Sequence, residues 1–199
     1  MRLTLRGDDS LDLTEGVFAP YPVVNADGLL PTARQIGSPN FDERPSDCDV
    51  SLIVVHAISL PPEQFGGQGI EQLFTNTLDP AEHPYYAGIH HLRVSAHFLI
   101  RRDGAIEQFV PTTRRAWHAG ASCWNGRERC NDFSVGIELE GSDTQPFEAL
   151  QYPALAGLIR SIAGRHPVAD LAGHSDIAPG RKTDPGPFFD WHLLATLLR

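Results

Sequence analysis

The sequence has no long apolar run, no excess of basic residues and only three cysteines, and each absence excludes a class of protein. The N-terminal segment turns acidic at Asp8 and Asp9 and lacks an apolar stretch, so it does not resemble a secretory signal. The richest apolar stretch, residues 52–55, is far too short to span a bilayer. A formal net charge of -9 argues against nucleic-acid and membrane-surface partners, which usually meet a basic face.

The cysteines form no recognisable framework. Their odd number, in a chain without an export signal, indicates reduced thiols and favours the cytosol. Cys123 and Cys130 are spaced more widely than the paired cysteines of structural zinc sites, and no second pair accompanies them. We therefore interpret Cys48, Cys123 and Cys130 as ordinary residues and expect a cytoplasmic protein.

The length of 199 residues fits one globular α/β domain. We expect residues 1–27 to be an N-terminal extension with a short edge strand near 3–5, and residues 28–199 to form the domain. Apolar residues over 51–58 and 133–140 predict two buried strands, and Asp103-Gly104 predicts a hairpin joining 95–100 to 105–110. Helices are predicted near 29–35, over 70–76, from Thr144 to about 163, and after Asp190.

The stretch from Gly173 to Gly186 combines an imidazole, carboxylates, cations, prolines and glycines, a mixture that predicts a shaped loop. Within it His174 and Asp184 are usable zinc ligands. A third ligand must come from elsewhere, and the best candidate is His56, at the carboxyl end of the 51–58 strand, where sites gather in α/β sheets. His118 is a rival ligand, although its glycine-rich surroundings favour a substrate-facing role.

Two imidazoles and one carboxylate would leave zinc an open position, as in catalytic sites. Glu138, inside a predicted central strand, is the available general base, and Lys182 could stabilise an oxyanion. These residue types together favour zinc-assisted amide hydrolysis. The alternatives are that His56 is an ordinary core histidine and that Glu138 and Glu140 lie in water on an edge strand.

The same residues fall in a series of ordered motifs that runs from about residue 28 to the end. The motifs are SLIVVH (51–56), ISLPP (58–62), HLRVSAH (91–97), RRAWHAG (114–120), GRERCNDFS (126–134), GIELEG (136–141) and residues 174–190. In these the chain resembles the anhydro-muramyl-peptide amidases of bacterial wall recycling, within the zinc N-acetylmuramoyl-L-alanine amidase family. Ala57 departs from the pattern, because relatives carry asparagine there, and a hydrogen bond near the metal or substrate is expected to be lost.

The resemblance implies a single domain with a mixed central β-sheet flanked by helices, and a monomer. It implies hydrolysis of the amide between anhydro-N-acetylmuramic acid and L-alanine in a small-molecule muropeptide. The residues it implies are His56, His174 and Asp184 as Zn2+ ligands, Glu138 as acid/base, Lys182 as transition-state stabiliser, and Arg93, Trp117 and Arg129 as substrate-binding residues.

Three alternatives remain beside this interpretation. A non-catalytic muramyl-peptide-binding module of the peptidoglycan-recognition type would share the architecture but would not need Glu138 and Lys182. An amidase exported to the polymeric wall would need a signal. A purely structural role for the histidines would leave the protein without bound metal.

Overall fold

A computed structural model describes residues 3–4 and 22–199. Its elements, in chain order, are β1 (Leu3–Thr4), β2 (Arg34–Gln35), β3 (Phe41–Glu43), β4 (Leu52–Ile58), α1 (Gly69–Phe74), α2 (Pro84–Ile89), β5 (Phe98–Ile100), β6 (Ile106–Gln108), β7 (Arg114–Ala116), β8 (Cys123–Trp124), β9 (Arg127–Glu128), the 3-10 helix η1 (Cys130–Asp132), β10 (Ser134–Glu140), α3 (Gln151–Ala163), β11 (Asp170–Gly173), α4 (His174–Ile177) and α5 (Trp191–Leu197).

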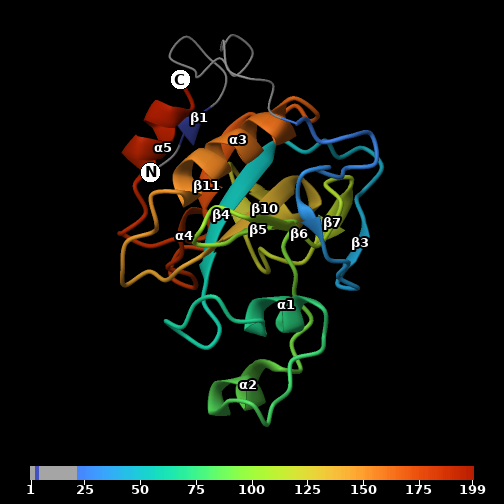
Figure 1. The fold of residues 1–199 in the computed structure, drawn as a ribbon. Coiled ribbons are helices and arrows are strands. Elements are labelled where there is room, and N and C mark those ends of the chain that lie inside the picture. Colours follow the sequence, from blue (N-terminus) through green and yellow to red (C-terminus); the bar gives the residue numbers. More distant parts are fainter. Residues whose placement is uncertain (1–2, 5–21) are drawn as a thin grey trace.

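A mixed sheet runs through the middle of the molecule (Figure 1). Among the described residues it has seven strands in the order β1-β11-β4-β10-β5-β6-β2. The central strands β11, β4, β10 and β5 run parallel to one another. At the two sides β1 pairs antiparallel with β11 and β6 pairs antiparallel with β5, and β2 then pairs parallel with β6. The predicted hairpin between β5 and β6 and the edge strand at Leu3–Thr4 are both present, and the α/β class with a mixed central sheet is confirmed.

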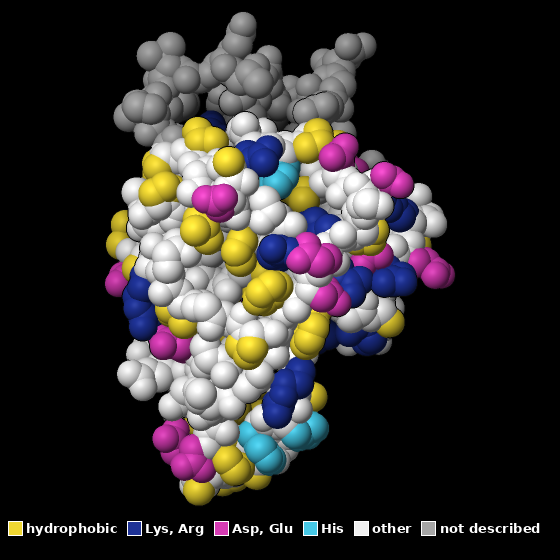
Figure 2. Space-filling model, turned by 90° about the vertical axis from the view of Figure 1, so that its right-hand side faces the viewer, with side chains coloured by type: hydrophobic (Ala, Val, Ile, Leu, Met, Phe, Trp, Pro, Cys, Tyr) yellow, Lys and Arg dark blue, Asp and Glu magenta, His cyan; other side chains and the backbone are white. Residues whose placement is uncertain are grey.

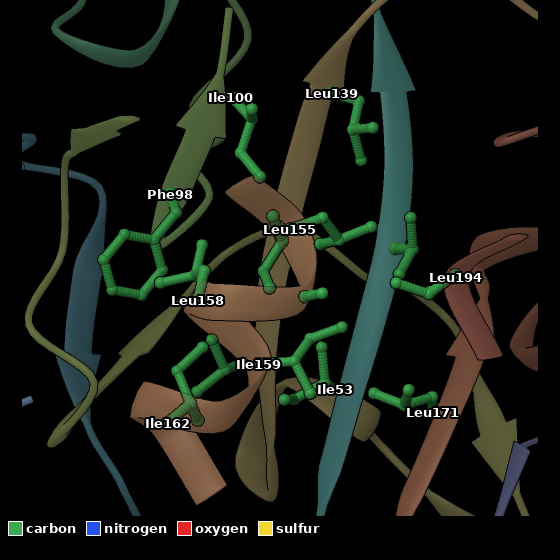
Figure 3. Close-up of a cluster of buried hydrophobic side chains, with 14 of the residues drawn as sticks. Ile53, Phe98, Ile100, Leu139, Leu155, Leu158, Ile159, Ile162, Leu171 and Leu194 are labelled. Carbon is green, nitrogen blue, oxygen red and sulfur yellow. The ribbon is translucent and has the colours of Figure 1, made fainter. Parts of the chain in front are cut away.

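The alternation of side chains along each strand divides the core between the two faces of the sheet. Ile53, Ile137 and Leu171 point to the face covered by α3, where the helix places a stripe of leucine and isoleucine against them (Figure 3). Leu194 of α5 joins the same cluster. This face is therefore wholly structural, and it holds β4, β10 and β11 at fixed positions.

The other face of the sheet carries His56 and Glu138, together with two smaller apolar clusters. One cluster, around Val54, Phe133 and Ile177, lies beneath the β11–α4 side. The second, around Leu99 and Phe109, packs α1 and α2 against β5 and β6. We call residues 69–89 the α1–α2 arm, which projects beyond the end of the sheet (Figure 1).

Two helix predictions differ from the structure. Residues 29–35 form turns and then β2, because Leu30 donates its backbone N–H to Gln108 Oε1 (2.8 Å) and β2 pairs with β6, so tertiary contacts override helix propensity. Conversely, α2 lies within 79–91, where no helix is predicted. Two residues mark the start of this helix. His83 caps it by accepting the Tyr85 N–H, and Pro84 occupies the first helical position.

Two further boundaries need correction. Helix α3 begins at Gln151 rather than at Thr144, and Pro153 lies in its first turn. The segment after Gly173 is not loop throughout, because His174–Ile177 form the short helix α4. Asp176 stabilises that turn by accepting the Gly173 N–H at 2.8 Å, a local bond that makes a helical start compatible with this polar sequence.

Both signs of charge lie side by side on the face shown in Figure 2. Ion pairs such as Arg115 with Asp42 and Arg34 with Glu71 show how the cations are matched by carboxylates. Over residues 3–4 and 22–199, no helix combines the length and the apolar character needed to cross a bilayer.

Candidate metal centre and active site

His56 and Glu138 occupy paired positions on neighbouring parallel strands, β4 and β10. Both side chains point away from the α3 face, since their odd-numbered neighbours Val55, Ile137 and Leu139 fill the α3 core. Both are buried. The two strands are neighbours at the centre of the sheet, and their register brings an imidazole and a carboxyl group together on one face.

His174 and Asp184 come from the segment that follows β11. His174 opens α4, and the carbonyl of Asp184 accepts the Ser175 N–H at 2.9 Å, which closes the segment on itself. His56 Nδ1 lies 2.9 Å from His174 Nδ1 and 3.3 Å from Asp184 Oδ2, and the last two atoms are 3.1 Å apart. The ligand atoms of this trio all lie within 4.8 Å of one another.

The donor set of the trio fits a metal ion. His174 Nε2 lies 3.3 Å from the Ala119 carbonyl, which can only accept, so this nitrogen carries the proton and Nδ1 presents a lone pair. That lone pair faces His56 Nδ1 and a carboxylate oxygen. Two imidazoles and a carboxylate turned toward one point are the ligand types of a catalytic zinc site.

Burial and hydrogen bonding shift the pKa values of two candidate ligands, His56 and Asp184. Burial lowers the pKa of His56 to about 4, so that the imidazole is neutral near pH 7. Burial alone would raise the pKa of Asp184, but the hydrogen-bonding contacts with His174 and His56 outweigh it and hold the pKa well below the usual carboxyl range. Neutral imidazoles and an ionised carboxylate are the forms that bind a cation.

Glu138 is a buried carboxyl with an unsatisfied atom. Its Oε2 has no hydrogen-bond partner among the described residues. Burial raises its pKa well above the ordinary value, the charge of Asp184 raises it further, and Lys182 acts in the opposite direction. A raised carboxyl pKa suits a group that must both hold and release a proton.

These residues line a cavity of about 500 Å³. Trp117, His118, Lys182 and Ala57 lie in its wall. The α1–α2 arm and the chain just after it contribute Tyr85, Ile89 and Leu92. The cavity is large enough for a small organic ligand.

Arg93 and Arg129 lie outside this wall. Both are exposed; Arg93 contacts the carbonyls of His90 and Leu92, and Arg129 lies 3.3 Å from Asp132. Sequence reasoning missed Arg181, whose Nη2 donates to the carbonyls of Ala119 (2.6 Å) and Ala121 (2.7 Å). No sequence signal could reveal this contact, because its acceptors are backbone atoms about sixty residues away.

The family model described as N-acetylmuramoyl-L-alanine amidase matches residues 46–187, a range that includes the whole trio, Glu138 and Lys182. The chain belongs to this family of amidases. Its relatives include the 1,6-anhydro-N-acetylmuramyl-L-alanine amidase AmpD of Citrobacter freundii, which is 59% identical over 174 residues, covering 86% of this chain and 93% of the relative.

Solved structures agree with this relationship. A crystal structure of a Se-Met AmpD derivative superimposes with a TM-score of 0.80 at 56% identity and covers 87% of this chain and 98% of that one. The amidase AmiD from E. coli, in complex with anhydro-N-acetylmuramic acid-L-Ala-D-gamma-Glu-L-Lys, has a TM-score of 0.56 at 30% identity, covering 79% of this chain and 65% of AmiD.

Proposed function

We propose that this protein hydrolyses the amide bond between 1,6-anhydro-N-acetylmuramic acid and L-alanine in small muropeptides, in cytoplasmic recycling of the cell wall. The observation that carries the proposal is the convergence of His56, His174 and Asp184 within 4.8 Å, beside a buried carboxyl group at Glu138. The high identity to amidases named for this bond supports the choice of substrate.

His56, His174 and Asp184 would hold Zn2+. When bound, zinc supplies Lewis-acid chemistry, polarising a carbonyl oxygen and making a water molecule more acidic. The neutral imidazole of His56 and the ionised carboxylate of Asp184 are ready to coordinate a cation.

Glu138 is proposed as the general base and acid. Its unpartnered Oε2 can take a proton from the attacking water and later return it to the nitrogen of the leaving L-alanine. Lys182 lines the same cavity, and its positive charge favours the ionised form of Glu138. The same charge would stabilise the negative oxygen that develops as the amide carbonyl is attacked.

Substrate recognition is proposed to involve the wall that faces the metal centre. Trp117 offers an aromatic surface inside the cavity. Arg93 and Arg129 are exposed cations that would meet the carboxylates of a stem peptide, which a guanidinium binds in a bidentate manner. The complex of AmiD with an anhydromuramyl tripeptide, in a related fold, supports a ligand of this class.

The test is incubation with anhydro-muramyl-tripeptide and, separately, with intact sacculi, with products identified by mass spectrometry. We expect free tripeptide from the soluble fragment only, loss of that product after zinc removal with a chelator, and its recovery on adding zinc. Bound but uncleaved muropeptide would instead support a binding module of the peptidoglycan-recognition type. Comparable release from sacculi would overturn the recycling role.

A further inference from the structure

We infer that His118 and Ser134 are positioning residues of the metal centre, because together they fix the proton of His56 on Nε2 and leave its Nδ1 free for a metal ion. The inference rests on the proposed function, since it assigns a role to residues beside the proposed ligands. Neither residue belongs to the trio of candidate ligands. In the hydrogen bonds that connect them to His56, each donor and each acceptor can be assigned.

The carbonyl of Cys130 determines which atom donates in each of these hydrogen bonds. Ser134 Oγ lies 2.6 Å from this oxygen, which can only accept, so the single hydroxyl proton of Ser134 is used there. The contact of 3.2 Å between Ser134 Oγ and His118 Nε2 must then have the histidine as donor. Ser134 is fully buried, and water therefore does not compete for these bonds.

The hydrogen bond between His118 and His56 fixes the position of the proton on the His56 ring. A neutral imidazole carries one proton, so His118, protonated on Nε2, presents a lone pair at Nδ1. This atom lies 2.9 Å from His56 Nε2, which must therefore carry the proton of the His56 ring. The Nδ1 of His56 is left with a lone pair, and it is the atom that faces His174 and Asp184.

Neighbouring residues fix the position of the His118 ring and backbone. A Cβ atom at Gly136 would lie 2.4 Å from His118 Cγ, so the strand beneath the ring needs glycine at this position. Asn131 Oδ1 accepts the backbone N–H groups of His118 (3.2 Å) and Ala119 (2.8 Å) and anchors the segment. The carbonyl of Ala119 accepts from His174 Nε2. The consecutive residues His118 and Ala119 thus each hydrogen-bond one of the two histidine ligands.

The experiment measures the zinc dissociation constant by chelator competition for the wild type and three variants. His118→Leu removes the acceptor and should weaken zinc binding about 10- to 100-fold, the usual effect of losing an outer-shell partner. His118→Asn should keep an affinity close to wild type, because its side-chain oxygen can replace Nδ1 as acceptor. Ser134→Ala should weaken binding less than His118→Leu, since the ring stays but its orientation is no longer fixed.

A matched control is Ser161→Ala, which removes an equally buried hydroxyl that also donates to backbone carbonyls but lies on α3, away from the site. It should bind zinc as the wild type does. Nitrogen NMR of the imidazole rings in metal-free wild type gives a second test that needs no variant, and it should show His56 protonated on Nε2.

Three results would overturn parts of this account separately. A wild type that binds no zinc would overturn the proposed metal site itself. Normal zinc binding by His118→Leu, or a His56 ring protonated on Nδ1 in the metal-free protein, would overturn the positioning role while leaving the amidase function intact.

Discussion

At the scale of single residues, Glu138 shows how the position of a carboxyl group in the sheet determines its properties as an acid and base. A carboxyl group is rarely buried without a partner, because losing its hydration costs free energy. Here the parallel pairing of β4 and β10 keeps Glu138 beside His56 in a dry position, and one of its oxygens has no partner within residues 3–4 and 22–199. Such an arrangement is destabilising for a purely structural residue and useful for a proton carrier.

Replacing Glu138 with glutamine keeps the shape of the side chain but removes its ability to carry the proton. We expect Glu138→Gln to bind zinc at one ion per chain and to lower turnover about 10²- to 10⁴-fold, the usual worth of a general acid–base group. Metal analysis and product chromatography check both expectations. Glu128→Gln, at an exposed glutamate on β9, should have normal turnover. Full activity in Glu138→Gln would contradict the base assignment.

Local sequence signals were enough to pick out the residues that the structure brings together as a trio. His56 ends an apolar strand, and His174 and Asp184 lie in one polar segment, so each stood out from its neighbours. The contacts that surround them were not predictable. Arg181 and His174 bind the carbonyl of Ala119, and a backbone acceptor leaves no mark in the sequence.

At the scale of elements, β4 was predictable because burial on both faces imposes an unbroken apolar sequence, and β10 because apolar and polar residues alternate along it. The hairpin of β5 and β6 followed from Asp103-Gly104. The short elements were not predictable in the same way. Residues 29–35 carry helix-forming side chains, yet pairing with β6 and the bond from Leu30 to Gln108 determine their conformation.

Helix α3 depends on its apolar stripe against the sheet, and Leu155 lies in that stripe with no exposed surface (Figure 3). We expect Leu155→Ala to lower the free energy of unfolding by about 2–5 kcal/mol, because it leaves a cavity in a close-packed core. Leu150→Ala, at a side chain that is 61% exposed just before the helix, should change it by about 0.5 kcal/mol or less. Urea unfolding measures both, and equal losses would contradict this account of the core.

At the scale of the whole molecule, the fold keeps several histidines neutral. Burial lowers the pKa of His166 to about 4 and that of His97 well below its usual value. His97 Nδ1 accepts the Gly136 N–H at 3.0 Å, and Nε2 lies 3.0 Å from the Arg114 carbonyl, a pair of bonds that only the neutral ring can make. Protonation of these rings is therefore coupled to unfolding.

The sign of this coupling follows from the two pKa values of His166. Between about pH 4 and 6.5 the unfolded chain binds a proton on His166 that the folded chain does not, so the free energy of unfolding rises with pH in this window. Urea unfolding of chelator-treated protein should give a lower stability at pH 5 than at pH 7. His166→Gln should weaken this pH dependence, whereas His192→Gln, at an exposed histidine, should preserve it. An unchanged slope in His166→Gln would contradict the prediction.

The α1–α2 arm supports one wall of the cavity on a packing cluster of its own, whereas the trio is anchored by β4, β11 and the cluster around Val54 and Ile177. This wall of the cavity and the candidate metal ligands therefore rest on separate packing clusters. Substitutions at wall residues such as Tyr85 and Leu92 are therefore expected to leave the candidate ligands in place. The architecture is thus suited to divergence, in which new wall shapes admit new muropeptides while the reaction at the centre stays the same.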